Sequence, residues 1–200
     1  NFANKNGFKY ILTGANFSTE CVREPLEWNY HTSDLSQLKD IHNKFGLKKL
    51  ETFPTSDILK YKIYYRFFKG IKVIQPLNHV PYIKEDVINK LTKKFDWQKY
   101  AYKHHESRFT KFYESYWLPN KFGFDKRRNQ LSSLILTKQL SRDEAIIQIN
   151  EPAYDQKTIE EDFEYIANKL DISISELRDL FNGENKTFRD YKNKMFILEL

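Results

Sequence analysis

The sequence predicts an α/β domain followed by a mainly helical region, on three observations. Two short apolar runs, at residues 8–12 and 71–77, have the composition of buried strands. Segments with helical apolar spacing lie between and after these runs, which is the element order of α/β proteins. Beyond residue 96 no run has strand character. We therefore expect residues 1–95 to form the α/β domain and residues 96–200 the helical region.

The first domain is expected to begin with the strand at residues 8–12, which ends at Thr13-Gly14. Ser33 then caps a helix that ends at Gly46 and whose apolar face consists of Leu35, Leu38, Ile41, His42 and Phe45. Residues 55–68 predict an aromatic helix, and Pro76 ends the second strand. The last helix of this domain carries an apolar stripe of Val87, Ile88, Leu91 and Phe95.

Two strands alone make a poor sheet, because a stable sheet usually needs three or more. The chain begins with Asn1 rather than Met, and it leads almost directly into the first strand. We therefore expect the remaining strands to lie N-terminal to residue 1, in a longer protein of which this chain is a piece.

The helical region contains clear start and stop signals. Residues 126–138 present an apolar face, and a further helix is lined by Ile159, Phe163, Ile166 and Leu170. The patterns Ser141-x-x-Glu144 and Ser173-x-x-Glu176 predict capping boxes that open two more helices. Gly183 is expected to end the second of these.

The composition predicts a polar globular protein. The 200 residues suffice for a sizeable core, 40% are hydrophobic, and the mean hydropathy is −0.71. No apolar run approaches the length of a membrane span, so we expect a cytoplasmic protein without membrane contacts. The single cysteine, Cys21, excludes an internal disulfide framework, and without a neighbouring histidine it predicts a structural residue rather than a nucleophile.

Positive charge is concentrated in residues 99–128, which we call the basic segment. It contains eight Lys or Arg and three Asp or Glu, a net charge of +5 out of +6 for the whole chain. Such a concentration indicates an anionic partner. The same segment mixes histidine and carboxylate side chains with the cations, which favours a chemical site over simple adhesion.

The run Asp125-Lys126-Arg127-Arg128 is the strongest candidate for a phosphate site. Lysine and arginine are unfavourable in the first turn of a helix, where aspartate is favourable. Cations kept in that place therefore suggest a ligand, and arginine binds phosphate through paired hydrogen bonds. The alternative is a basic helix start that faces solvent.

The run His104-His105-Glu106 does not predict a metal site, because adjacent residues point to different sides and no third ligand follows at helical spacing. A histidine here is a candidate proton carrier. Glu106 is a candidate partner of Arg108 or Lys111, and the alternative is a structural network of ion pairs.

The loop after the first strand is a candidate nucleotide contact. In open α/β sheets, ligands bind beyond the carboxyl ends of the strands. Gly14 lets the backbone approach a ligand, and Asn16 offers a donor and an acceptor; an ordinary strand-to-helix turn is the alternative. The sequence contains neither G-x-x-x-x-G-K-[ST] nor G-x-G-x-x-G, so a nucleoside triphosphate would need binding groups from elsewhere.

Aromatic residues interleave with the basic segment. They are able to stack on nucleobases, but the spacing of the first five is that of a helical stripe, which favours a buried core. The set is Phe109, Phe112, Tyr113, Tyr116, Trp117, Phe122 and Phe124.

The same region resembles the C-terminal half of the N-acetyl sugar amidotransferases, enzymes of lipopolysaccharide O-antigen and related surface-polysaccharide biosynthesis. Weaker agreement is found in Leu12-Thr13-Gly14-Ala15-Asn16 and Gln75-Pro76-Leu77-Asn78. The motifs that carry the resemblance are Lys103-x-x-Glu106-Ser107-Arg108-Phe109-Thr110, Leu118-Pro119-x-Lys121-Phe122-Gly123-x-Asp125-Lys126-Arg127, Leu131-Ser132-Ser133-Leu134-Ile135 and Arg142-x-Glu144-Ala145.

This family is similar to the PP-loop ATP pyrophosphatases, so the resemblance implies a partial PP-loop domain with a parallel sheet at residues 1–95. It implies a ligase-type reaction in which ATP adenylates the amide oxygen of a sugar acetamido group and ammonia displaces AMP, giving an acetamidino group. It also implies ATP and Mg²⁺ as cofactors and a UDP-linked or other nucleotide-linked N-acetyl sugar as substrate. A glutaminase subunit and a synthase-like subunit would supply the ammonia.

The chain departs from the family pattern because the ATP loop Ser-Gly-Gly-x-Asp-Ser and the N-terminal cysteine pairs are absent. By itself the chain is therefore expected to be inactive.

Residue by residue, the resemblance implies three sets of contacts. Thr13, Gly14 and Asn16 would line the nucleotide pocket. Lys121, Lys126, Arg127 and Arg128 would bind phosphates. Glu106, Arg108, Lys111 and Asp125 would surround the reacting groups, with Glu106 and Asp125 as candidates for holding Mg²⁺, orienting the cations or accepting protons.

Two other functions compete with this interpretation. A nucleic-acid-binding module fits the pI of about 9.1 and the abundant aromatics, and predicts exposed aromatic side chains and salt-sensitive binding. A purely structural or partner-docking helical domain predicts no pocket beside the basic segment.

Overall fold

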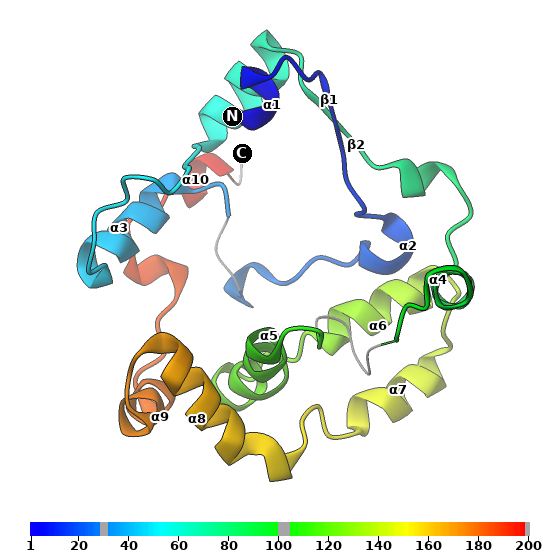
Figure 1. Ribbon diagram of the computed structural model, residues 1–200, viewed down its shortest axis with the longest axis vertical. Coiled ribbons are helices and arrows are strands. Elements are labelled where there is room, and N and C mark those ends of the chain that lie inside the picture. Colours follow the sequence, from blue (N-terminus) through cyan, green and yellow to red (C-terminus); the bar gives the residue numbers. More distant parts are fainter. Residues whose placement is uncertain (29–31, 100–104, 199–200) are drawn as a thin grey trace. The chain divides into compact units, whose positions relative to one another are not determined.

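The computed structural model describes residues 1–28, 32–99 and 105–198 (Figure 1). The chain divides into two compact units. Unit 1 comprises residues 1–15, 24–79 and 186–200, and unit 2 comprises residues 16–23 and 80–185. The described part is mostly helical, and its one sheet is a parallel pair of strands in unit 1. The two strands lie where the sequence predicts them, and the helical character of the second half is confirmed.

Unit 1 contains both strands. Its elements are α1 (Phe2–Lys5), β1 (Tyr10–Leu12), a 3₁₀ turn (Leu26–Trp28), α3 (Leu35–Phe45), a π-helix (Lys60–Phe68), β2 (Lys72–Ile74), two further 3₁₀ turns (Pro76–His79 and Phe188–Asp190) and α10 (Met195–Leu198). The aromatic helix predicted at residues 55–68 is therefore confirmed, although its hydrogen-bond pattern is that of a π-helix.

The strands pair in parallel, with Ile11 opposite Val73, and run side by side in Figure 1. The expectation that the strand at residues 8–12 is buried is wrong: Tyr10 is 61% and Leu12 is 69% exposed. A parallel sheet normally has both faces covered by helices. Here the two three-residue strands are too short to bury an apolar face on their own, and no third strand pairs with them in the described residues.

Helix α3 differs from its predicted orientation. The helix is capped by Asp34 rather than Ser33, since the Asp34 side chain accepts from the backbone N–H groups of Ser36 and Gln37. Asp34, Gln37 and Asp40 are buried. Of the predicted apolar face, Phe45 is exposed and the other members are partly buried, namely Leu35, Leu38, Ile41 and His42. The cause is a distant segment of unit 1, because the backbone amides of residues 192 and 194 donate to Asp40 and Asp34.

Gly46 ends α3 as predicted, but for a steric reason. Its φ is −75°, so the left-handed region is not involved. A Cβ atom at this position would lie 2.4 Å from ring atoms of His42. The Cβ atom would also lie 2.5 Å from the His42 backbone carbonyl oxygen, which cannot turn away as the ring can, so the close approach of the helix backbone favours glycine here.

Unit 2 is entirely helical in its described residues. Its elements are α2 (Phe17–Glu20), α4 (Lys84–Phe95), α5 (Arg108–Phe112), a π-helix (Tyr113–Phe122), α6 (Arg127–Leu136), α7 (Arg142–Asn150), a 3₁₀ turn (Gln156–Thr158), α8 (Ile159–Leu170) and α9 (Ile174–Asn182). No helix in the described part of the chain combines the length and the apolar character needed to span a bilayer.

The predicted capping box at the start of α7 is confirmed, with both hydrogen bonds between Ser141 and Glu144 present. At the start of α9, Ser173 caps the helix by accepting from the Glu176 backbone, but the return bond of a capping box is not present in the described residues. Gly183 ends α9 as predicted. These local contacts satisfy backbone N–H groups that have no partner within the helix.

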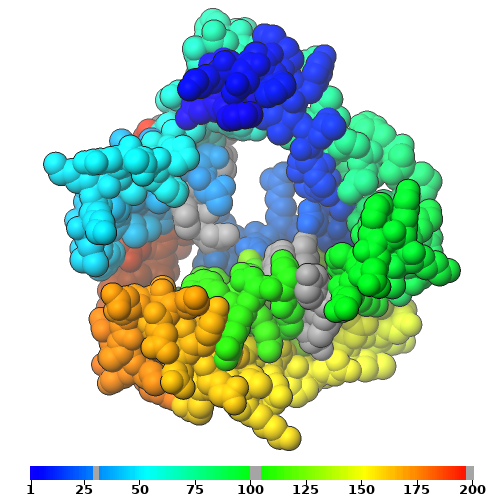
Figure 2. All heavy atoms as spheres, in the orientation of Figure 1, coloured from blue at the N-terminus to red at the C-terminus, as the bar shows by residue number. Residues whose placement is uncertain are grey.

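An aromatic core joins α5, the π-helix, α8 and α9. In Figure 2 the atoms of α8 and α9 form one continuous orange region. Phe112 and Phe163 meet edge to face with ring centroids 5.1 Å apart. The buried members are Phe112, Tyr154, Ile159, Phe163, Ile166, Ala167 and Leu177. The predicted stripe of α8 is thus confirmed for Ile159, Phe163 and Ile166, while Leu170 at its end is exposed.

Helix α2 packs on α6 through a short polar contact. The Oγ of Ser133 accepts from the backbone N–H of Val22 at 3.0 Å, and Thr137 Oγ1 donates to the Ser18 carbonyl at 2.8 Å. Cys21 lies in this contact, with its Sγ 3.9 Å from the Ser133 carbonyl oxygen. Its surroundings are those of a structural cysteine.

Candidate functional site

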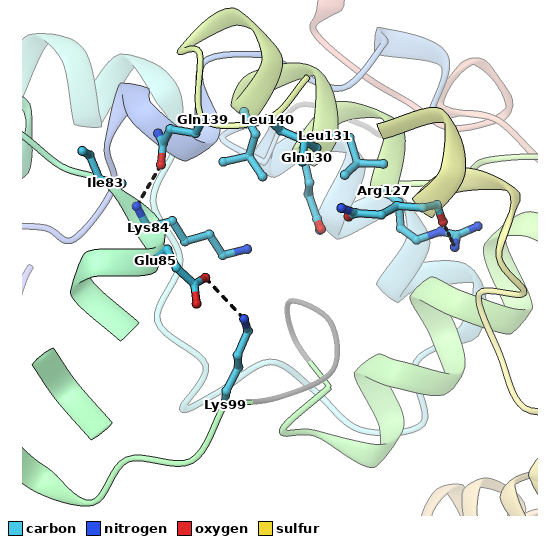
Figure 3. A pocket seen from close by; sticks show the side chains of 11 residues that line it. Ile83, Lys84, Glu85, Lys99, Arg127, Gln130, Leu131, Gln139 and Leu140 are labelled. Carbon is cyan, nitrogen blue, oxygen red and sulfur yellow. Dashed lines mark hydrogen bonds and ion pairs between the residues drawn. The ribbon is translucent and has the colours of Figure 1, made fainter. Parts of the chain in front are cut away.

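A pocket of about 290 Å³ opens in unit 2 between the start of α4 and helix α6 (Figure 3). The volume is near the lower end of the roughly 300–1,000 Å³ that small-molecule pockets occupy. Its lining combines aliphatic, amide and charged side chains: Ile83, Lys84, Glu85, Lys99, Arg127, Gln130, Leu131, Leu134, Gln139, Leu140 and Gln148.

One wall of the pocket is held by a contact between distant residues. The backbone N–H of Lys84, the first residue of α4, donates to Gln139 Oε1 at 2.8 Å. Ile83 precedes the helix and offers no side-chain cap. The Gln139 side chain therefore takes the place of a cap residue, and it fixes α4 relative to the end of α6.

The charged rim is open to water. Lys99 and Glu85 form an ion pair of 3.4 Å in which their side chains are 56% and 63% exposed. Figure 3 shows Lys84 and Gln130 pointing into the space from opposite sides. The lining thus includes three cationic side chains and one carboxylate, which favours a ligand that carries negative charge.

Arg127, which was predicted to bind phosphate, forms part of this wall but is fully engaged within unit 2. Its Nε and one Nη donate to the Asp125 carboxylate, the shortest contact being 2.7 Å. Its remaining N–H groups donate to the carbonyls of Gln148, Ile149 and Glu151, at the end of α7. These contacts use all five donors of the guanidinium group, so a phosphate would have to displace them.

The neighbouring candidates also have partners inside unit 2. Lys126 pairs with the half-buried Glu114 at 3.0 Å. Lys121 donates to the carbonyls of Phe181 and Gly183, both at 2.7 Å, where α9 ends. Cations at helix C-termini bind unpaired carbonyls and interact favourably with the helix dipole. Arg128 is exposed.

Arg108, another predicted site residue, has an exposed side chain that binds a buried carboxylate. It pairs with Asp162 of α8, which is 4% exposed, and its guanidinium carbon lies 4.3 Å from the centroid of the Tyr165 ring. The hydroxyl of Tyr154 donates to the same carboxylate. Burial and the hydrogen bond to Asp162 raise the pKa of Tyr154 well above its ordinary value, and the bond to Asp162 raises the pKa of Arg108.

Of the remaining candidates in the basic segment, Lys111 lies beside Tyr154, with its Nζ 5.0 Å from the centroid of the ring, and Glu106 is exposed. Arg108 therefore pairs with Asp162 and not with Glu106. His105 Nε2 is 2.9 Å from Ser115 Oγ. His104 lies outside the described residues.

The predicted nucleotide contacts fall in both units. Thr13 and Gly14 belong to unit 1. The backbone N–H of Thr13 donates to the Ile74 carbonyl at 3.0 Å, which extends the hydrogen bonding between β1 and β2 by one residue. A Cβ atom at Gly14 would have open space around it. Asn16 belongs to unit 2 and caps α2 by accepting from the Thr19 backbone at 3.0 Å. A shared nucleotide pocket for these three residues remains a prediction.

The aromatic residues of the basic segment are divided between core and surface. Phe112 is buried, and Tyr116 and Trp117 pack against the core. Phe109 and Tyr113 are exposed and stack on each other with an interplanar angle of 12°. Because most of the helical stripe is committed to the core, the structure argues against a nucleic-acid-binding surface built on it.

The sequence signalled some pocket residues and not others. Lys99 and Arg127 belong to the basic segment. No sequence pattern marks the other polar residues of the lining, because isolated lysines and glutamines are common on helix surfaces; these are Lys84, Gln130, Gln139 and Gln148. No sequence signal marks Gln139 as a cap, since the helix that it caps starts 55 residues earlier.

Residues 106–200 match the family model of the lipopolysaccharide (LPS) biosynthesis protein WbpG-like, C-terminal domain. No curated protein and no solved structure matches the chain.

Proposed function

We propose that this protein, whose residues 106–200 are a WbpG-like C-terminal domain of lipopolysaccharide biosynthesis proteins, is part of an ATP-dependent N-acetyl sugar amidotransferase of the cytoplasm. The observation that carries the proposal is the position of the match. It begins at Glu106 and includes the motifs, up to Ala145, on which the resemblance to the amidotransferases rests. A role in lipopolysaccharide biosynthesis follows from the family, and the reaction is our inference.

The proposed reaction converts an acetamido group of a nucleotide-linked sugar into an acetamidino group. An amide carbonyl is a poor electrophile, so its oxygen first attacks the α-phosphorus of ATP, and pyrophosphate leaves. Ammonia then adds to the activated carbon, a proton is lost, and AMP departs with the former amide oxygen. Positive charge near the phosphates would stabilise both steps.

The residues divide between binding and support in this proposal. Thr13, Gly14 and Asn16 are assigned to the nucleotide, and Glu106, Arg108, Lys111 and Asp125 to the surroundings of the reacting groups. Lys121, Lys126, Arg127 and Arg128 are assigned to phosphates. Of this last set, Arg128 is exposed, whereas the other three would have to exchange internal partners for a ligand.

The proposed cofactors and partners need groups beyond those described. Within residues 1–28, 32–99 and 105–198 no three acidic, histidine or cysteine side chains form a potential metal site, and Asp125 already accepts from Arg127. The described residues therefore do not fit Mg²⁺ by themselves, and we derive no step through it. The glutaminase and synthase-like subunits are proposed as the source of ammonia.

The test is a reaction of the longer protein that contains this chain with ATP, Mg²⁺, ammonium and UDP-linked N-acetyl sugars. Mass spectrometry should detect a sugar in which one oxygen has been replaced by NH, together with AMP in equal amount. Omission of ATP should abolish both products. If ATP and sugar are supplied and neither amidine nor AMP forms with any N-acetyl sugar, the proposed reaction is wrong.

A further inference from the structure

We propose that the pocket between α4 and α6 binds the sugar phosphate portion of the substrate, that is, an N-acetyl hexosamine with a phosphate on its anomeric carbon. This inference rests on the proposed function for the identity of the sugar. The pocket itself, with its lining of aliphatic, amide and cationic side chains, is a property of unit 2 alone.

The size of the pocket favours part of a nucleotide sugar over the whole. At about 290 Å³ it is near the lower limit for pockets that enclose a small molecule. A single pyranose ring with a phosphate has a suitable size, whereas a nucleoside would extend into solvent or contact another part of the longer protein.

The lining has the chemistry that a sugar requires. Leu131, Leu134 and Leu140 provide an aliphatic surface for the C–H groups of the ring and for the methyl group of an acetamido substituent. Gln130 and Gln148 each provide amide donors and an acceptor, which suit hydroxyl and amide groups of the ligand. Figure 3 shows Gln130 pointing into the space.

The phosphate is assigned to the end of the pocket formed by Lys84 and Lys99. Lys84 points into the space from the wall opposite α6 (Figure 3). Lys99 pairs with Glu85 at 3.4 Å, and both side chains are largely exposed. Exposed pairs of this kind are weak, so a phosphate oxygen is able to replace the carboxylate.

Arg127, the third cation of the lining, is bound within unit 2. Arg127 uses its donors on Asp125 and on three carbonyls of the α7 end. It therefore shapes the wall, while Lys84 and Lys99 supply the charge that attracts the ligand. Charge-assisted hydrogen bonds from lysine to phosphate are among the stronger polar contacts.

The experiment is an isothermal titration of the 200-residue chain with N-acetylglucosamine 1-phosphate, N-acetylglucosamine and inorganic phosphate as separate probes. The sugar phosphate should bind more tightly than either of the other two. Lys84→Ala should weaken its binding at least about tenfold, the loss expected for a charge-assisted hydrogen bond. Gln130→Leu should lower the affinity for the sugar phosphate but leave the affinity for inorganic phosphate unchanged.

A matched control is Lys90→Ala, which removes an exposed lysine from the same helix outside the pocket. It should leave the affinity unchanged, and circular dichroism should show that all variants keep the helical content of the parent chain. Equal binding of the parent and of Lys84→Ala would overturn the proposal, as would inorganic phosphate binding as tightly as the sugar phosphate.

The two proposals fail in different ways. If the longer protein forms amidine and Lys84→Ala leaves its KM for the nucleotide sugar unchanged, the pocket assignment is wrong and the proposed reaction stands. If the titration succeeds and no amidine forms under any condition, the reaction is wrong and the sugar phosphate site stands.

Discussion

Phe163 of α8 and Leu12 of β1 are both apolar residues that the sequence marks as buried, yet they are 1% and 69% exposed. Phe163 has ring neighbours from two other helical segments of unit 2, Phe112 and Phe181. Leu12 belongs to a strand that, within the described residues, has one partner, which covers one edge and neither face. An apolar pattern thus becomes a core only where other elements of the same unit supply a second surface.

Cations bind partners inside both units. In unit 1, Lys194 pairs with Asp57 at 2.9 Å, and Lys44 pairs with Asp40 and donates to the Asp190 carbonyl. In unit 2, Arg127 and Lys121 each bind the carbonyls at the end of a helix, and Arg108 reaches a buried carboxylate. The charge that makes the basic segment conspicuous in the sequence is therefore largely used to hold helices of unit 2 together.

The largest expected effect is the loss of a core ring. Phe163→Ala should lower the free energy of unfolding by about 3–5 kcal/mol, because it removes a buried ring and leaves a cavity. The matched change in unit 1, Phe67→Ala, removes a ring that is 78% exposed and should cost no more than about 0.5 kcal/mol. Urea unfolding followed by circular dichroism measures both, and equal losses would contradict the contrast between the units.

The buried carboxylate of Asp162 should have the next largest effect. Asp162→Asn keeps the shape but removes the charge that Arg108 and Tyr154 contact, and should cost about 1.5–3 kcal/mol in urea unfolding. Glu160→Gln is the matched control, since Glu160 also pairs with an arginine but is 77% exposed; its expected cost is about 0–1 kcal/mol. Similar costs for the two variants would show that Asp162 has no special role.

Two neighbouring arginines allow a comparison between a cation that is bound internally, Arg127, and one that is exposed, Arg128. Arg127→Gln leaves Asp125 and the end of α7 without their partner, and should cost about 1–3 kcal/mol in the free energy of unfolding. Arg128→Gln should cost no more than about 0.5 kcal/mol, as for other surface changes. If Arg127→Gln is as stable as the parent protein, its contacts do not stabilise the helical unit.

The stability of unit 1 should depend on pH through the carboxylate of Asp57. The hydrogen bond from Lys194, together with the backbone N–H of Leu59, lowers the pKa of Asp57. The folded state therefore binds this proton less tightly than the unfolded state, and the stabilisation is present above the ordinary pKa of about 4 and is lost as the pH falls below it. Asp57→Asn should reduce the loss of stability between about pH 6 and about pH 3. An unchanged pH profile in urea unfolding would contradict the assignment.

Local signals in the sequence predicted the helical unit well. Ser141 and Glu144 lie within one turn, and the α8 stripe repeats every three or four residues. All the residues that form each of these patterns are close together in the sequence, so the pattern can be recognised there. The partners of Arg127 lie 21 to 24 residues away along the chain, except for Asp125. The sequence placed Lys126, Arg127 and Arg128 at an unfavourable helix start and suggested a ligand. The structure shows that Arg127 binds the C-terminal carbonyls of a different helix and that Lys126 pairs with Glu114.

The same distinction explains what the sequence missed in unit 1 and at the pocket. The polar face of α3 is buried because backbone amides more than 150 residues later donate to Asp34 and Asp40. The pocket depends on Gln139 reaching the first amide of α4. Contacts of this kind depend on how distant elements meet, and no local pattern of residues encodes them.

The most direct test of the contrast between the units is native-state hydrogen exchange of the backbone amides, which reports the stability of each segment separately. The slowest exchange should occur in α5, α8 and α9, around Phe112 and Phe163, and the amides of β1 and β2 should exchange much faster. If the slowest amides instead lie in β1 and β2, the stable core of this protein is not the helical unit, and the central claim is wrong.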